Sequence, residues 1–215
     1  MLAHLFAIVL TLAASNGMPG SCAGCDFSHM DLSGKDLSGV RYAGADFSHS
    51  DLRNASFAGA HLAGADFSNA DLSGVDLRNA RLAGTDFRNA KLDGIKLDGL
   101  DCAGCDLQGV DLHGRSLHGL SFPGADFRNA NLRDVDFSGV DLCSRDESTT
   151  ITNGVIVSRG NKIECGDFRG ADVHGANFAG VLLCESNGGK KTCTPVDAAT
   201  LRAGTRSSLD GARLP

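Results

Sequence analysis

The chain has 215 residues, of which 42% are hydrophobic and 21% charged, and its formal net charge at pH 7 is −6. Direct binding of nucleic-acid phosphates requires a stripe of basic residues. The chain is acidic overall and its lysine and arginine residues are scattered, so direct nucleic-acid binding is excluded. Almost all phenylalanine and leucine residues fall at one repeated spacing, which indicates a single repeat domain rather than two small globular ones.

Residues 1–21 lie outside the repeat. The apolar run from Leu5 to Ala14 is too short to span a bilayer but has the length of a signal peptide, and small residues follow it. No lysine or arginine precedes the run, so a hydrophobic helix capping the open end of the repeat is the alternative. We predict a signal peptide and a secreted or periplasmic location, or a cytoplasmic one if residues 1–21 are a capping helix.

From Cys25 to Leu142, every fifth residue is large and apolar except Cys102. The residue two positions earlier is mostly small or β-branched, and the residue two positions later is usually Gly or Asn. A period of five fits neither a helix nor a strand. Gly and Asn tolerate the positive φ of a tight turn, so the chain is predicted to bend once every five residues.

A second period of twenty shows how often the chain closes on itself. Residues 27, 47, 67, 87 and 127 are Phe, with Leu at 107, and residues 32, 52, 72, 92, 112 and 132 are Leu. Four five-residue sides therefore make one coil. We predict an all-β solenoid of square section, whose coils stack at a strand spacing of about 4.8 Å.

The units, such as Ala-Asp-Phe-Ser-His at 45–49, resemble the pentapeptide repeat family over residues 22–142 and 166–183. The resemblance implies a right-handed quadrilateral β-helix, here of about seven four-sided coils within residues 22–183; the handedness comes from the resemblance alone. Members of this family do unrelated things. Some resemble duplex DNA in shape and charge and inhibit DNA gyrase.

The eight cysteines form four local pairs. Cys22 and Cys25 share a CxxC motif with Cys102 and Cys105, and a four-residue turn brings its end Cα atoms within about 7 Å, near disulfide reach. The two motifs lie four coils, or about 19 Å, apart, which excludes a shared zinc site. We predict disulfides here; packed free thiols, or a redox or metal role, are the alternatives.

The repeat is interrupted between Cys143 and Cys165. Residues 144–164 are predicted to form an inserted β-hairpin with a type I′ turn at Asn153-Gly154, closed at its base by a Cys143–Cys165 disulfide. The repeat then resumes at Phe168, on the Phe side of the coil. The hairpin either carries binding specificity or shields the end of the stack.

Residues 184–215 are predicted to cap the other end. Cys184 and Cys193 pinch a loop, and Thr194 and Pro195 are placed to open a short helix that Gly204 would end. Leu201 of this helix is expected to face the last coil, since solenoid ends need a cap.

An aspartate precedes each large residue of the Phe side up to the insertion. These residues are Asp26, Asp46, Asp66, Asp86, Asp106 and Asp126. Each is expected to accept hydrogen bonds within its own turn. The functional alternative is an acidic face for a basic protein partner, and cation binding along the row is a third possibility.

No set of residues typical of catalysis, cofactor binding or metal binding emerges. His29 and His49 occupy turn positions where Asn alternates, so we interpret them as turn residues. We predict an exported, disulfide-stabilised scaffold for protein interaction or structure, without a membrane span and without direct nucleic-acid binding. End-to-end homodimerisation is left open. The alternative is a cytosolic, acidic DNA mimic that inhibits a DNA-processing enzyme such as gyrase.

Overall fold

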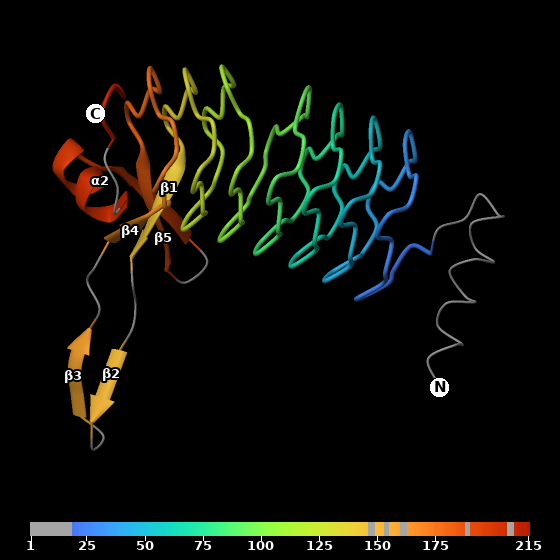
Figure 1. Cartoon of the computed structure of the whole chain (residues 1–215). Coiled ribbons are helices and arrows are strands. Elements are labelled where there is room, and N and C mark those ends of the chain that lie inside the picture. Colours follow the sequence, from blue (N-terminus) through green and yellow to red (C-terminus); the bar gives the residue numbers. More distant parts are fainter. Residues whose placement is uncertain (1–18, 146–148, 153–154, 160–162, 188–189, 206–208) are drawn as a thin grey trace.

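The computed structural model describes residues 19–145, 149–152, 155–159, 163–187, 190–205 and 209–215. The backbone from residue 21 to residue 141 winds into stacked coils, in which residues twenty apart form parallel β-bridges (Figure 1). Each coil has four walls of five residues. Wall 1 comprises residues 26–30 and their repeats, wall 2 residues 31–35, wall 3 residues 36–40 and wall 4 residues 41–45, each with its own repeats. The predicted quadrilateral β-helix is therefore observed.

The large residue of each wall points inward and stacks on its equivalent in the next coil. Phe47, Phe57 and Phe67 are fully buried. The rings of Phe47 and Phe67 stack at 4.9 Å between centroids, and Phe57 meets Phe47 edge-on at 5.5 Å. Such aromatic pairs stabilise beyond the area they bury, so the core is held mainly by contacts between neighbouring coils.

The corners have the predicted backbone geometry. Asn54 has a φ of 59°, and the next residue, Ala55, closes the turn by donating its N–H to Leu52 O at 2.9 Å. His29 and His49 have a φ of 58°, which confirms that both are turn residues.

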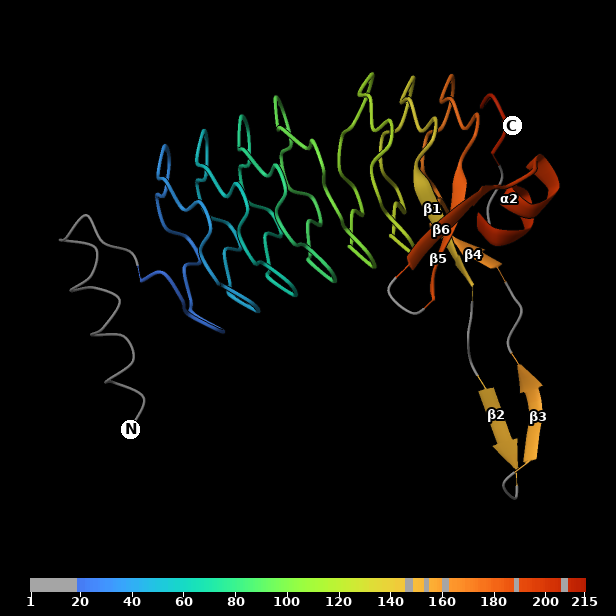
Figure 2. The ribbon, with the colours of Figure 1, turned by 180° about the vertical axis from the view of Figure 1, so that it is seen from behind.

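The interruption contains the expected hairpin. Strand β1 (Asp141–Arg145) pairs antiparallel with β4 (Ile163–Cys165) at the base, and β2 (Thr149–Thr152) pairs antiparallel with β3 (Val155–Arg159) further out. In Figures 1 and 2 the β2–β3 ribbon projects away from the stack. The predicted type I′ turn at residues 153–154 lies outside the described residues.

The stack resumes in register after this excursion. Asp126 bridges Asp167, and the rings of Phe127 and Phe168 stack with centroids 5.1 Å apart. The predicted return to the Phe side is therefore confirmed.

The C-terminal cap differs from the prediction at the start of its helix. Strand β5 (Leu182–Asn187) pairs antiparallel with β6 (Lys190–Pro195), and the helix α2 spans Ala198–Thr205. The sheet has the order β4-β1-β5-β6.

Thr194 and Pro195 were expected to open the helix, and this was wrong. Pairing with β5 continues as far as Pro195, so both residues belong to β6. Asp197 caps α2 instead, because its Oδ1 accepts the N–H of Thr200 at 2.7 Å. Gly204 lies inside the helix rather than beyond it, and a Cβ atom there would lie 2.7 Å from Cys165 Sγ.

The cap also includes a buried leucine of the helix and a short C-terminal segment. Leu201 is fully buried, as expected, and residues 209–214 add a further rung on wall 3, where Arg213 bridges Asn177. In the described part of the chain, no helix is both long enough and apolar enough to cross a membrane.

Candidate interaction face

The predicted aspartates of wall 1 lie in one file, linked by consecutive parallel bridges from Asp26 to Asp126. The structure adds a seventh member, Asp167, which bridges Asp126 across the insertion. The sequence prediction ended the row at Asp126. The signal for the missing member was the Asp-Phe pair at 167–168, which repeats the pattern of the wall.

Each aspartate of the file is held by its own turn. The carboxylate Oδ1 accepts the backbone N–H two residues later, at 3.0 Å for Asp26, 2.7 Å for Asp66 and 3.0 Å for Asp126. This is the local hydrogen bonding expected of Asp in a turn. The second carboxylate oxygen, Oδ2, contacts other side chains, such as Arg128 at Asp126 and Gln108 at Asp106.

The file divides into two parts according to the residue that follows each aspartate by two. In the C-terminal part an arginine there pairs with its carboxylate, at 2.5 Å for Asp86, 2.6 Å for Asp126 and 2.6 Å for Asp167. The N-terminal part has serine at this place. Serine follows Asp26, Asp46 and Asp66, as Ser28, Ser48 and Ser68. Asp106 is the exception in the C-terminal part, because Gln108 follows it.

We call Asp26, Asp46 and Asp66, together with Asp31 on the adjoining wall 2, the acidic face. Among the described residues, none of the four carboxylates takes part in an ion pair within 4.0 Å. At the corner between the two walls, the rings of His29 and His49 stack with centroids 4.9 Å apart and an interplanar angle of 3°. The face is therefore a stack of carboxylates bordered by two imidazoles.

Hydrogen bonding and burial shift the acidity of three members of the file in different directions. The hydroxyl and N–H of Ser28 lower the pKa of Asp26, and the Arg169 side chain lowers the pKa of Asp167. Burial raises the pKa of Asp106, and the charges of Asp126 and Asp86 add to this.

At Asp106 the residue two positions later is Gln108 instead of an arginine. Its amide Nε2 donates to Asp106 Oδ2 at 3.0 Å and to Asp126 Oδ2 at 3.2 Å. Neighbouring like charges on a β-stack destabilise it unless they are bridged or screened, so Gln108 is the neutral bridge of this part of the file.

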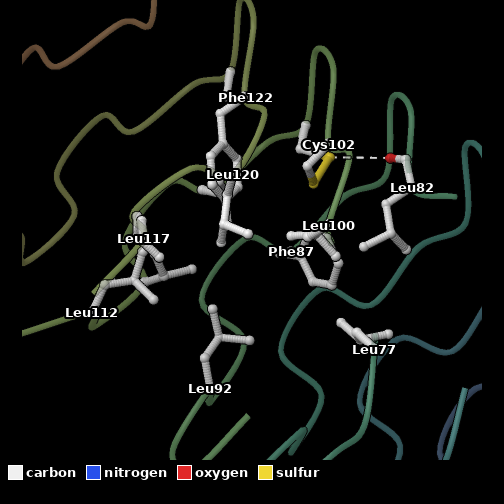
Figure 3. Close-up of a cluster of buried hydrophobic side chains, with 14 of the residues drawn as sticks. Leu77, Leu82, Phe87, Leu92, Leu100, Cys102, Leu112, Leu117, Leu120 and Phe122 are labelled. Atoms are coloured by element: carbon white, nitrogen blue, oxygen red, sulfur yellow. Dashed lines mark hydrogen bonds between the residues drawn. A yellow bond between two sulfur atoms is a disulfide. The ribbon is translucent and has the colours of Figure 1, made fainter. Parts of the chain in front are cut away.

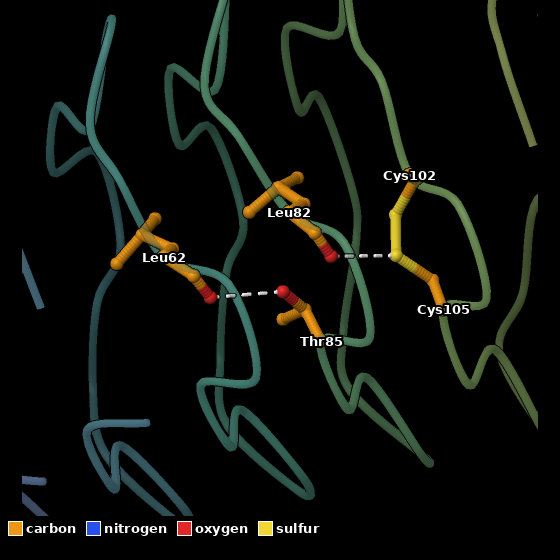
Figure 4. The surroundings of a disulfide bond; sticks show 5 residues. All are labelled: Leu62, Leu82, Thr85, Cys102 and Cys105. Atoms are coloured by element: carbon orange, nitrogen blue, oxygen red, sulfur yellow. Dashed lines mark hydrogen bonds between the residues drawn. A yellow bond between two sulfur atoms is a disulfide. The ribbon is translucent and has the colours of Figure 1, made fainter. Parts of the chain in front are cut away.

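The cysteines lie in the four predicted pairs. The Cα atoms of Cys22 and Cys25 are 5.7 Å apart, and those of Cys102 and Cys105 are 5.4 Å apart. Figure 4 shows the second pair, with Cys105 Sγ 3.0 Å from Leu82 O in the coil before.

The other two pairs join facing strands. Cys143 lies opposite Cys165 in β1 and β4, and Cys184 lies opposite Cys193 in β5 and β6. Within the ranges that the structure describes, no group of three or more His, Cys, Asp or Glu side chains is arranged to hold a metal ion.

The comparison with protein families matches the profile described as pentapeptide repeats, in eight copies, over residues 21–57, 43–79, 76–114 and 116–144. The comparison with curated proteins gives no match.

Several solved structures of pentapeptide repeat proteins are similar to this chain. One is a thylakoid-lumen protein of Arabidopsis thaliana, which is 36% identical and has a TM-score of 0.32, with 54% of this chain and 70% of that chain covered. HetL of the cyanobacterium Nostoc sp. strain PCC 7120, a protein involved in heterocyst differentiation regulation, is 24% identical, with 80% of each chain covered and a TM-score of 0.43. QnrB1, a plasmid-mediated fluoroquinolone resistance protein, is 23% identical, with 91% of this chain and 82% of that chain covered and a TM-score of 0.38.

Proposed function

The chain belongs to the pentapeptide repeat family, whose members fold as right-handed quadrilateral β-helices, and from this premise we propose that it is an exported scaffold that binds a basic protein partner through its acidic face. The scaffold is stabilised by disulfides and carries out no catalysis. It consists of about seven coils, one for each aspartate in the file of wall 1, and two copies can associate end to end.

The observation that carries this proposal is the difference between the two parts of the file. An arginine two residues later would neutralise each carboxylate, as happens at Asp86, Asp126 and Asp167. The acidic face has none, so its charges remain available to a partner. Complementary charge across an interface raises the association rate and selects the partner.

Export is supported by the cysteines. Eight cysteines in four pairs at disulfide distance suit an oxidising compartment. Residues 1–18, which would be removed with the signal peptide, lie outside the described residues. Mass spectrometry of the native, non-reduced protein is expected to find a cleaved N-terminus and four disulfides; an intact Met1 with free thiols would overturn export.

Catalysis is not part of the proposal because the walls are flat, and flat surfaces seldom form the concave pockets that catalytic sites need. The alternative of a DNA mimic needs continuous negative charge along the stack. Arg88, Arg128 and Arg169 interrupt that charge on wall 1, which favours the scaffold.

The test uses matched triple variants of one wall. Asp26→Asn, Asp46→Asn and Asp66→Asn together remove the charge but keep an oxygen that can accept the turn hydrogen bond. The control is Asp86→Asn, Asp126→Asn and Asp167→Asn, which alters carboxylates already paired with arginine. A photoreactive amino acid at Ser48 then reports the partner by cross-linking in the producing cells.

The wild type and the control are expected to give one adduct with a basic protein, weakened by salt, and the acidic-face variant is expected to lose it. The proposal fails if no adduct forms, or if the acidic-face variant forms it as well as the control does.

A further inference from the structure

The ladder of β-bridges is continuous on two walls of the solenoid and broken on the other two. Wall 1 runs unbroken from Asp26 to Asp167, and wall 4 from Ser21 to Asp141. On wall 2 no bridge joins Lys91 to Asp111, and on wall 3 none joins Lys96 to Ser116, although all of these residues are described. Both breaks lie between the same two coils, residues 86–105 and 106–125. We call this level the seam.

The hydrogen bonds confirm the break. In the regular coils Leu72 N–H donates to Lys91 O at 2.9 Å, and Leu77 N–H donates to Lys96 O at 3.0 Å. One coil later, the N–H groups of Leu92 and Leu97 donate no backbone bond to Asp111 and Ser116. The N–H groups of the turn residues Gly94 and Gly99 likewise donate no backbone bond to the next coil. Figures 1 and 2 show wider spacing among the green coils at this level.

The cause is visible in the small inward position, the one that follows each corner glycine or asparagine. On wall 2 the residues before and after the seam are Ile95 and Arg115, and on wall 3 they are Leu100 and Leu120. Elsewhere these walls carry smaller residues there, apart from the exposed Lys35 in the first coil. Wall 2 has Ala55, Val75 and Val135, and wall 3 has Ala60, Ala80 and Val140.

Walls 1 and 4 keep small residues at the same level, namely Ala90 and Val110 on wall 1 and Cys105 and Ala125 on wall 4. Excess volume in a packed core is relieved by shifts of the backbone. The walls that carry large residues on both sides of the seam are the walls that separate.

The opening is apolar inside and bridged by one side chain. A cavity of about 20 Å³ lies between the coils, lined by Leu97 and further apolar residues. Figure 3 shows two of them, Leu92 and Leu117. Leu97 is partly exposed, whereas its equivalents Leu77 and Leu117 are fully buried. The guanidinium of Arg115 crosses the gap and donates to Leu92 O at 3.0 Å, so a side-chain hydrogen bond joins the two coils on this wall.

We propose that the seam is a hinge, at which the solenoid bends about the continuous walls 1 and 4 and opens on walls 2 and 3. The two continuous walls meet at one corner of the square, so the coils separate at the opposite corner, between walls 2 and 3. Opening costs no backbone hydrogen bond on walls 2 and 3, because those bonds are already absent. The motion sets the angle between the acidic face in the N-terminal coils and the β2–β3 hairpin in the C-terminal ones. The hinge does not depend on what the acidic face binds.

Pulsed electron paramagnetic resonance can measure this motion. Spin labels are attached through a non-canonical amino acid, which spares the cysteines, at residues 53 and 133 on wall 2 or at residues 43 and 123 on wall 4. Each pair spans the seam and four coils, about 19 Å in a regular stack. The wall 2 pair is expected to give a longer and broader distance distribution than the wall 4 pair.

A closing variant supplies the control. Ile95→Val, Leu100→Ala, Arg115→Val and Leu120→Val introduce residues of the kind that the same walls carry in regular coils. This variant is expected to shorten and narrow the wall 2 distribution and to leave the wall 4 distribution unchanged. Equal distributions on the two walls of the wild type would overturn the hinge, as would a folded closing variant that keeps the broad one.

Hydrogen exchange of the wild type tests the hinge without any variant. The amides of Leu92 and Leu97 are expected to exchange at least about tenfold faster than those of Leu72 and Leu77, their equivalents one coil earlier. Equal protection would mean that the ladder is closed in solution, and the proposal would fail.

Discussion

The coils around Phe57 and the coils at the seam follow the same five-residue rule and differ in outcome. Around Phe57 the small inward positions of walls 2 and 3 hold alanine and valine, every ladder bond forms and the large residues are fully buried. At the seam the same positions hold isoleucine, leucine and arginine, and two ladders break. The large residue of each unit therefore fills the core, while the small one decides whether neighbouring coils can close on each other.

The largest expected effect comes from emptying the regular part. Phe67→Ala removes a fully buried ring that stacks on Phe47 and Phe87, and we expect it to cost about 3–5 kcal/mol of unfolding free energy. Phe67→Asp should abolish folding, because it buries a charge without a partner. Leu97→Ala at the seam should cost only about 1 kcal/mol, since Leu97 is partly exposed. Denaturation followed by circular dichroism compares the three variants, and equal costs for the two alanine variants would contradict the distinction.

The next effect comes from building a second seam. Ala60→Leu and Ala80→Leu place large residues on facing coils of wall 3, and each is expected to cost about 1–3 kcal/mol. The amides of Phe57 and Gly59, which now donate across this level, should lose protection against exchange. Ala65→Leu on wall 4 serves as a single-residue control, with no large neighbour in the next coil. Unchanged protection of Phe57 and Gly59 would show that volume alone does not open the ladder.

The two CxxC motifs place the same kind of disulfide in two regions of different packing, the first coil and the seam. Cys102 and Cys105 are buried beside the seam on continuous wall 4, whereas Cys22 and Cys25 are not fully buried in the first coil. Replacing Cys102 and Cys105 with alanine should lower the free energy of unfolding by about 2 kcal/mol. Replacing Cys22 and Cys25 with alanine should lower it by less. Titration with a reductant, followed by thiol alkylation, should modify Cys22 and Cys25 first; modification of the buried pair first would be the contrary result.

The smallest effects concern wall 1, which is continuous through both regions. The pKa of Asp167 is lowered in the folded state, so its contribution to stability is present above the unfolded pKa of about 3.9 and is lost as the pH falls through the folded value. The pKa of Asp106 is raised, so ionising it costs stability as the pH rises above the unfolded value.

At pH 7, Asp106→Asn is therefore expected to be neutral or stabilising, by no more than about 1 kcal/mol, and Asp167→Asn to be destabilising. The Asp106 difference should vanish below about pH 4, and the Asp167 difference should decline from about pH 4 downward, through the lowered pKa of the folded state. Thermal melts at the two pH values measure this, and a destabilising Asp106→Asn would reverse the assignment.

Much of the fold was predictable because one rule is repeated many times. The periods of five and twenty gave the walls, the inward Phe and Leu files and the positive φ of corners such as Asn54. The family is confirmed, and so is the return of the chain to the Phe side at Phe168. The aspartate file followed from the same register.

The parts that were not predicted depend on contacts rather than on period. The start of α2 was wrong because pairing between β5 and β6 carries Pro195 into a strand. The seam was not predicted, although its large residues are visible in the sequence. They are Ile95, Leu100, Arg115 and Leu120. Their size breaks the ladder only because they face each other in successive coils. The split of the aspartate file was likewise readable from the serine or arginine that stands two residues after every aspartate except Asp106. Only the structure shows that these arginines form ion pairs with the carboxylates.

The insertion between β1 and β4 leaves the stack as it would be without it. Bridge partners across it are 41 residues apart instead of the usual 20, yet Asp136 and Asn177 meet like any other rung. The corner between β1 and β4 therefore tolerates insertions, so a peptide epitope of another length can replace the hairpin there without changing the stacking of the β-helix.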